Sequence, residues 1–222
     1  MDREAVWLSV RLAGATTLLL LLVGTPLAYW LGRSRRRWKV LVEAAVALPL
    51  VLPPTVLGFY LLLAMGPRSP LGRLYERITG DLLPFSFRGL LVASVLYSLP
   101  FAVQPMMAAF AQVDEGLLES SHTLGEGGIG TFVRTVLPLA LPGIVAAAVL
   151  SFAHTLGEFG VVLMVGGNIP GETRTVSISI YDQVQALDYG AAGRTALVLL
   201  VVSFVVLVIT YATQRRVWAW PH

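Results

Sequence analysis

The sequence contains no cysteine, one lysine and few charged residues of either sign. Without cysteine, the chain forms no disulfide, thiolate metal site or dithiol redox centre. Asp, Glu, Lys and Arg make up 13% of the 222 residues, against about 25% in soluble domains. Because 56% of the residues are hydrophobic, the chain has too little polar surface for a soluble fold. We therefore expect an all-α integral membrane protein folded as one unit over residues 1–222.

Further absences limit the function. No G-x-x-x-x-G-K-[ST] motif is found, so the chain does not supply phosphoryl transfer itself. No aromatic-basic patch supports nucleic-acid binding, and the net charge of +3 suggests basic loops that face anionic lipid. A cleavable signal peptide is not expected, because Met1–Glu4 is not basic and no A-x-A site follows the first apolar run.

Five apolar stretches are long enough to cross a membrane, each holding about 20 residues or more. The first is flanked by Trp7 and Trp30, a residue type enriched at membrane interfaces. The predicted spans are residues 7–30, 40–65, 89–111, 135–165 and 195–213.

Basic residues predict the orientation. Five cations and no acid lie between Gly32 and Lys39, directly beside two spans, which places this loop in the cytoplasm. Five spans then put the N-terminus outside and the C-terminus, with Arg215 and Arg216, inside. Glu43 is expected to form salt bridges with the arginines at 35–37.

Segment 112–134 separates the third and fourth spans and falls in the cytoplasm. Asp114 can cap a short helix, and Gly125 stands where a left-handed residue would end it. The glycines from Gly127 to Gly130 predict an open turn before the chain re-enters the membrane. The segment is acidic, with Arg134 as its one cation, so it suits a protein partner better than anionic lipid.

The same segment carries a motif. Glu119-Ser120-Ser121, then Gly125, then Leu137-Pro138 resembles the EAA motif of ABC importer permeases, with serines in place of two alanines. Thr135 stands where that family usually has isoleucine. The resemblance implies a coupling helix that docks in a cleft of a separate ATPase subunit. The residues it assigns to ATPase coupling are Leu117, Glu119, Ser120, Ser121, Leu124, Gly125, Leu137 and Pro138.

Further stretches resemble the molybdate and sulfate group of type I ABC importer permeases. They are LPLVLPPTVLGFYLLLAMG (48–66), TLGEFGVVLMVGGNIPGETRT (155–175) and GAAGRTAL (190–197). The resemblance implies a permease subunit, not an enzyme, that moves molybdate through the cytoplasmic (inner) membrane, with sulfate and tungstate as alternatives. It also implies a homodimer with two ATPase subunits inside and a molybdate-binding protein outside. The chain itself would need no cofactor, because the ATPase binds ATP.

Molybdate is a dianion, and no Arg or Lys lies in the central part of any predicted span. We therefore expect a low-affinity path lined by hydroxyls and backbone N–H groups. Alternatively, each hydroxyl bonds back to its own helix. The candidate hydroxyls are Thr55, Ser94, Ser98, Ser151 and Thr155.

Two spans carry residues that disturb a regular helix. Pro49, Pro53 and Pro54 interrupt the second span, which is either a bent, gate-forming helix or one with a packing kink. Glu158 lies in the fourth span, where an ionisable residue costs energy unless it is bonded or protonated. We expect it to bond to backbone or hydroxyl groups, or to be protonated, and to hold a helix break at Gly157 and Gly160.

Other readings of these residues remain open. His154 and Glu158 are spaced as a metal pair but lack a third ligand, and with Ser151 they superficially suggest an intramembrane hydrolase. A secondary transporter would need charged residues at mid-membrane or inverted repeats, and neither is evident. Glu172 and Arg174, in a turn-rich outer loop, either contact the binding protein or pair charges within the loop.

Overall fold

The computed structural model describes residues 2–218, with side chains described through Val208. The described residues form helices and connecting loops and contain no strand. The prediction of an all-α fold is therefore confirmed. The helices are α1 (Arg3–Arg33), α2 (Lys39–Val51), α3 (Pro54–Met65), α4 (Pro70–Thr79), α5 (Phe87–Ala111), α6 (Glu115–Thr123), α7 (Gly128–Thr131), the π-helical turn η1 (Phe132–Val136), α8 (Leu137–Gly157), α9 (Gly160–Gly166), α10 (Val176–Gln185) and α11 (Tyr189–Trp218).

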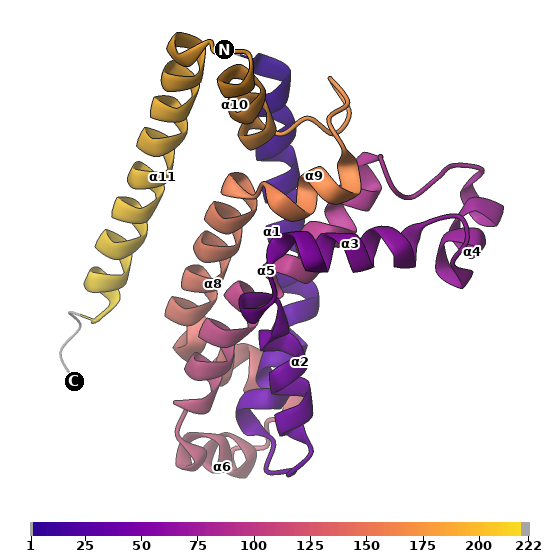
Figure 1. Ribbon diagram of the computed structural model, residues 1–222. Coiled ribbons are helices and arrows are strands. Elements are labelled where there is room, and N and C mark those ends of the chain that lie inside the picture. The colour runs from indigo at the N-terminus through magenta and orange to yellow at the C-terminus, as the bar shows by residue number, and fades with distance from the viewer. Residues whose placement is uncertain (1, 219–222) are drawn as a thin grey trace.

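Helices α1, α5 and α8 run side by side and form the centre of the bundle (Figure 1). Their contact faces bury Leu20, Met106 and Phe110 completely. Gly24 of α1 allows the close approach, since a Cβ there would lie 3.1 Å from the Met106 methyl group. Lipid tails are as apolar as these side chains, so dense van der Waals packing rather than burial from water holds such helices together.

Within residues 2–218, four helices are long and apolar enough to cross a membrane, and the total is five if the bent pair α2–α3 counts as one span. Each of these overlaps one of the five predicted spans. The first begins earlier than expected, because the Asp2 carboxylate accepts a hydrogen bond from Ala5 N at 3.0 Å and caps α1. The last, α11, begins at Tyr189, and its side chains beyond Val208, including Arg215 and Arg216, lie outside the described part.

The fourth span differs most from its prediction. A continuous helix runs from Gly128 through α7 and η1 to Gly157, where residues 135–165 were expected. The predicted open turn over Gly127–Gly130 is therefore wrong after Gly127. Glycine lowers helix propensity by about 1 kcal/mol per residue. Here the first turn is supported by Thr131, whose Oγ1 lies 3.1 Å from the Ser121 hydroxyl of α6.

Two helices lie in segments expected to be loops. Ser69 caps α4 by accepting from Gly72 N at 2.8 Å, and Gly80 ends that helix in the left-handed conformation. Helix α10 is attached to α1, where Val176 N donates to Ser9 Oγ at 2.8 Å. Hydropathy alone does not reveal such short helices, because neither is long enough to span a membrane.

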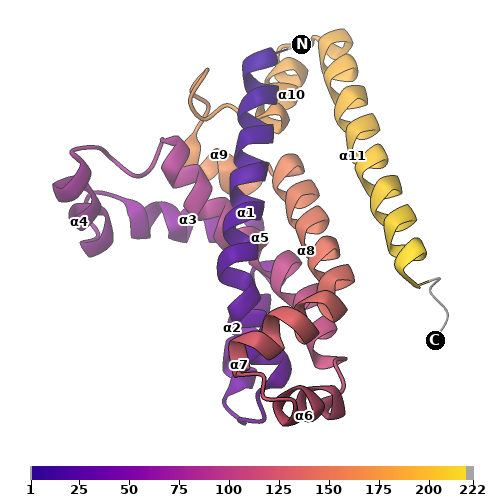
Figure 2. The same ribbon diagram turned by 180° about the vertical axis from the view of Figure 1, so that it is seen from behind.

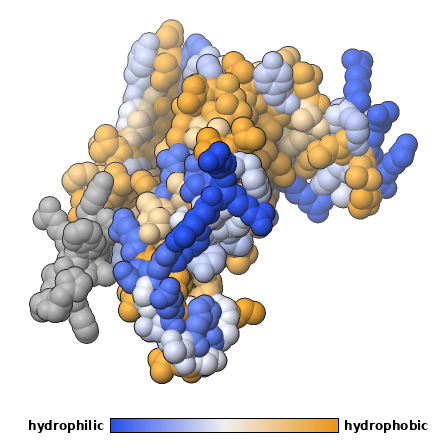
Figure 3. Space-filling view, turned by 90° about the horizontal axis from the view of Figure 1, so that it is seen from below, coloured by the Kyte–Doolittle hydropathy of each residue, from blue (hydrophilic) through white to orange (hydrophobic). Residues whose placement is uncertain are grey.

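Different elements form the two ends of the bundle. The N-terminus and α10 lie at one end, and α6 lies at the other together with the loop between α1 and α2 (Figures 1 and 2). Hydrophilic side chains gather on the α6 end (Figure 3). The predicted salt bridge of Glu43 is corrected: Glu43 pairs with Lys39 at 3.5 Å, one helical turn away, while Arg35 pairs with Glu115.

Candidate functional site

Helix α6 has defined caps at both ends. The Asp114 carboxylate accepts from Gly116 N at 2.7 Å, as expected for an N-cap. Gly125 follows the helix with φ of 86°, and its N–H donates to His122 O at 3.0 Å. The expected left-handed residue is thus confirmed, and it turns the chain sharply toward α7.

Helix α6 presents several of the predicted coupling residues outward. Leu117, Glu119 and Ser120 are exposed, and Leu124 is 85% exposed. Ile129, at the start of α7, is 84% exposed. It was not predicted as a coupling residue, although an isoleucine among the glycines of a polar segment could have indicated this role. Exposed apolar side chains at a polar end of the molecule are typical of a surface that binds another protein.

Other predicted coupling residues lie elsewhere. Ser121 is only 8% exposed and contacts Thr131, so it joins α6 to α7 and is not part of the outward face. Leu137 is half-buried and Pro138 exposed on α8, beyond the helical turn η1. Proline offers no N–H to the carbonyl four residues before it, and the turn ahead of Pro138 is widened, with Leu137 N bonding to Phe132 O.

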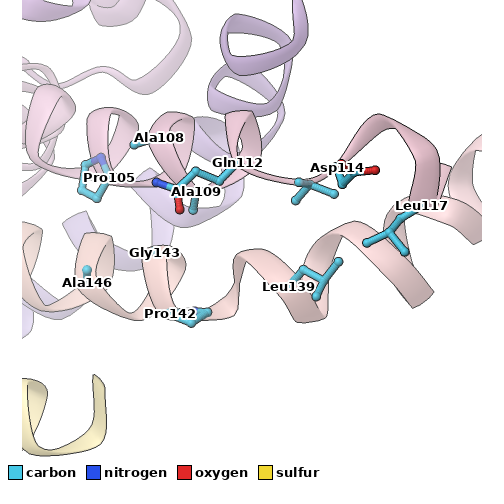
Figure 4. Close-up of a pocket in the computed structure, with 11 residues that line it drawn as sticks. Pro105, Ala108, Ala109, Gln112, Asp114, Leu117, Leu139, Pro142, Gly143 and Ala146 are labelled. Carbon is cyan, nitrogen blue, oxygen red and sulfur yellow. The ribbon is translucent and has the colours of Figure 1, made fainter. Parts of the chain in front are cut away.

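A groove runs between α5 and α8 toward the base of α6 (Figure 4). Its volume is about 480 Å³, and its walls are mostly small or apolar side chains. The two helices meet at Gly143, where a Cβ would overlap that of Ala109. Sequence reasoning did not predict this groove. Its lining residues are Pro105, Ala108, Ala109, Gln112, Val113, Asp114, Leu117, Leu139, Pro142, Gly143 and Ala146.

Two spans are broken, and their outer pieces meet. The second span bends by 114° between α2 and α3, at Leu52 and Pro53. This confirms the predicted bend at Pro53 and Pro54, whereas Pro49 lies inside α2 and away from the break. Helix α8 ends at Gly157, and α9 then runs crosswise to the bundle, as α3 does (Figure 1).

Helices α3 and α9 touch through their glycines. A Cβ on Gly58 would lie 2.7 Å from Met164 Cβ, and one on Gly160 would lie 2.7 Å from Pro54 Cβ. Neither position has room for a side chain without displacing the other helix. The helices that follow the two breaks are therefore closely packed against each other.

Glu158 lies at the second break and is buried. Its Oε2 accepts a hydrogen bond from Ser94 Oγ of α5 at 3.2 Å, while its Oε1 has no hydrogen-bond partner among the described residues. The expected bond to a hydroxyl and the expected helix break are both confirmed. Ser94 thus ties α5 to the point where α8 ends.

The other candidate hydroxyls are distributed unevenly. Ser98 Oγ lies 2.9 Å from both His154 Nδ1 and Thr155 Oγ1, so these groups bond between α5 and α8. Ser151 is buried, and its Oγ has no partner among the described residues. Thr55 is exposed at the start of α3, apart from the others. The role of these hydroxyls in a path stays a prediction.

The side chains of Ser151, His154 and Glu158 do not form the hydrolase site or the metal site considered as alternatives. His154 bonds to Ser98 and stacks on Phe101, with ring centroids 3.9 Å apart, while the Ser151 hydroxyl has no partner in the described chain. A nucleophile must lie within hydrogen-bond reach of its base, and this pair does not. Within the described residues, no group of three His, Asp or Glu side chains could hold a metal ion.

Arg174 bonds both within its loop and to helix α10. Arg174 Nε donates to Asn168 Oδ1 at 2.6 Å and lies 3.7 Å from Asp182 Oδ2. Arg174 therefore pairs with Asp182 of α10, and not with Glu172 of its own loop. Glu172 is exposed.

Comparison with known proteins places the chain in a family. Residues 24–219 match the family described as binding-protein-dependent transport system inner membrane component. The chain belongs to this family. As a transport-system inner membrane component, it lies in the inner membrane, which agrees with its apolar helices and the localisation predicted from the sequence.

Relatives of this inner membrane component share most of its length. The molybdenum transport system permease protein ModB of Azotobacter vinelandii is 54% identical over 214 residues, covering 96% of this chain and 95% of that protein. The ModB protein of Escherichia coli K12 is 38% identical over 205 residues, covering 92% of this chain and 89% of that protein.

Solved structures share its fold. A chain of a bacterial ABC transporter involved in the import of alginate superposes with a TM-score of 0.77 at 19% identity, covering 96% of this chain and 78% of that chain. A chain of the MetNI methionine ABC transporter gives 0.74 at 16% identity, covering 98% and 96%. The inner membrane component therefore has the type I ABC importer permease fold.

Proposed function

We propose that this chain is the permease subunit of an ATP-driven importer that moves molybdate across the inner membrane into the cell. Its relatives in A. vinelandii and E. coli carry the name of a molybdenum transport permease, and they cover nearly the whole chain. Tungstate is almost the same size as molybdate, and sulfate carries the same charge, so both remain alternatives. The working unit is a homodimer with the path at the interface between its two copies.

The observation that carries this proposal is the outward face of α6. Leu117, Leu124 and Ile129 expose apolar side chains at the polar end of the molecule, between two spans. Such a face fits a cleft in a cytoplasmic ATPase subunit, one per copy of the chain. The ATPase binds and hydrolyses ATP, and the permease carries no cofactor of its own. Nucleotide-driven movement of the ATPases would displace α6.

The transverse helices supply the gate. Helices α3 and α9 lie across the bundle at the breaks made by Pro53, Pro54 and Glu158, and they contact each other directly. A backbone break at membrane depth is tolerated where it lines a cavity or abuts protein. The buried hydroxyls of Ser94, Ser98, Ser151 and Thr155 join the path only when α5 and α8 separate. Glu172, on the outer loop, contacts the loaded binding protein, and Arg174 holds that loop in shape.

Uptake in cells lacking their own oxyanion importers tests the proposal. The chain is expressed with the ATPase and binding protein encoded beside it, and entry of labelled molybdate and sulfate is measured. Gly125→Pro removes both the left-handed turn and the N–H that bonds to His122 O, so uptake should be lost while membrane insertion is retained. Gly127→Ala is the matched control, because Gly127 has an ordinary φ of −74° and open space around it.

The outcomes separate substrate from mechanism. Molybdate uptake that disappears in Gly125→Pro and persists in Gly127→Ala supports both identity and coupling. Uptake of sulfate but not of molybdate would support an importer whose substrate is sulfate. Normal uptake in Gly125→Pro would refute the coupling role of α6, and no ATP-dependent uptake of either anion would refute the importer.

A further inference from the structure

The loop between α1 and α2 is attached to the base of α6. Arg33, in the last turn of α1, donates from Nη1 to Val113 O at 2.7 Å. Arg35 Nη2 lies 2.8 and 2.9 Å from the two carboxylate oxygens of Glu115. Val113 and Glu115 flank Asp114, the N-cap of α6, so the contacts bracket the residue at which the helix begins.

The Arg33 contact is part of a close junction between α1 and α5. A Cβ on Gly32 would lie 2.8 Å from Met107 O, so the backbones of the two helices nearly touch at this end. Val113 is buried against the same core. Val113 lies just past Gln112, the C-cap of α5, and its carbonyl accepts the hydrogen bond from the guanidinium of Arg33. Arg33 therefore extends the rigid α1–α5 junction to the start of α6.

The far end of α6 is attached to a different span. Ser121 bonds to Thr131 of α7, and Glu126, just after the glycine turn, pairs with Arg134 of η1. These residues belong to the continuous helix that becomes α8. Helix α6 is thus fastened to α8 at its end and to α1 at its beginning, and α1 and α8 themselves pack together.

We propose that Arg33 and Arg35 are positioning residues that transmit displacement of α6 to α1. The inference rests on the proposed function, in which α6 receives movement from an ATPase. The basic loop would then serve coupling as well as orientation in the membrane. Arg33 carries more of the effect, because its bond is partly buried, whereas Arg35 and Glu115 are both largely exposed and their attraction is screened by water.

The same loop offers a control. The side chains of Arg36 and Arg37 are exposed, and in the described structure neither bonds to α6. Replacing Arg37 with alanine removes one positive charge from the loop, as replacing Arg33 does, but it leaves the contacts with Val113 and Glu115 in place. A loop that only sets the orientation would respond to both changes alike.

The experiment uses the complete complex with its ATPase and binding protein, reconstituted in proteoliposomes. ATP hydrolysis and molybdate uptake are measured together for Arg33→Ala, Arg33→Lys, Arg35→Ala and Arg37→Ala. We expect Arg33→Ala to retain bound ATPase and basal hydrolysis but to lose about fivefold or more of its uptake per ATP hydrolysed. Arg33→Lys should recover part of this loss, Arg35→Ala should lose less, and Arg37→Ala should match the unmodified complex.

Charge exchange tests the second contact. Arg35→Glu alone should lower uptake per ATP, and combining it with Glu115→Arg should restore it, since the pair is re-formed with reversed charges. Unchanged uptake per ATP in Arg33→Ala would overturn the inference. Equal loss in Arg37→Ala, or loss of bound ATPase in Arg33→Ala, would do the same. An unmodified complex without ATP-dependent uptake would instead overturn the proposed function, and the inference with it.

Discussion

Within the described residues, Glu158 is the only buried Asp, Glu, Lys or Arg, and it lies at the break between α8 and α9. It is a buried carboxyl group at the end of a span, with one oxygen bonded to Ser94 and the other without a partner in the described chain. An ionisable side chain at membrane depth is costly, so its one hydrogen bond carries unusual weight. The bond also joins α5 to the break between α8 and α9.

Removing the Ser94 hydroxyl should therefore lower the stability of the protein. We expect Ser94→Ala to lower the free energy of unfolding by about 1 kcal/mol, because it leaves a buried carboxyl oxygen without its hydrogen bond. The measurement is an SDS unfolding titration of the purified permease in bicelles. Ser120→Ala is the control, since Ser120 Oγ is exposed and donates to Gly116 O of its own helix. Equal stability of both variants would contradict the weight given to this bond.

At this scale the sequence indicated roles but not partners. A carboxyl group within an apolar run must be bonded or neutral, which predicted that Glu158 meets a hydroxyl and marks a break. That the hydroxyl belongs to Ser94 depends on how α5 lies along α8, and the two residues are 64 positions apart. The same is true of Ser121. Its small size did not reveal that it contacts Thr131 rather than an ATPase subunit.

The contact between α3 and α9 is the element-scale feature with the clearest consequence. Both helices follow breaks, and both use glycine where they touch. Gly160→Ala would place a Cβ 2.7 Å from Pro54 Cβ, and separating the helices to relieve that overlap should cost about 1–3 kcal/mol. We expect molybdate uptake to fall while the ATPase subunits stay bound.

Gly157→Ala is the matched control for that change. Gly157 ends α8 only three residues earlier, but an added Cβ there meets nothing within 4 Å. Uptake by Gly157→Ala should equal that of the unmodified chain. Normal uptake by Gly160→Ala, with the unfolding free energy unchanged, would show that the α3–α9 contact is not needed for the gate.

Long apolar helices and breaks at proline were predictable from the sequence, whereas the short helices were not. Stretches of about 20 apolar residues have few alternatives in a membrane, so the four long apolar helices were predictable, and the second predicted span covers the bent pair α2–α3. Proline lacks an N–H, so the bend at Pro53 and Pro54 was also predictable. The short helices α4 and α10 were missed, although Ser69-Pro70 and Gly80 are ordinary cap signals. The early start at Gly128 was missed because contact with α6 outweighs the poor helix propensity of glycine.

At the scale of the whole molecule, the predicted orientation in the membrane depends on which elements lie at each end of the bundle. The loop between α1 and α2 and helix α6 share one end of the bundle (Figure 1). Glu172 lines a pocket with Leu8 and Arg11, in the N-terminal part of α1. Basic residues in short loops favour the cytoplasmic side. Only this orientation allows α6 to meet a cytoplasmic ATPase and the Glu172 loop to meet a binding protein outside.

The absence of cysteine makes the orientation directly measurable, because each introduced cysteine is the only thiol in the chain. With a membrane-impermeant maleimide, Glu172→Cys should react in spheroplasts, and Ile129→Cys should react only after the membrane is permeabilised. Co-expressed ATPase should then protect Ile129→Cys, since its side chain is 84% exposed in the isolated chain and lies beside the docking face of α6. Reaction of Ile129→Cys in intact spheroplasts would place α6 outside, where no ATPase could reach it. Equal reaction with and without ATPase would still support the orientation, but it would show that the ATPase does not cover Ile129.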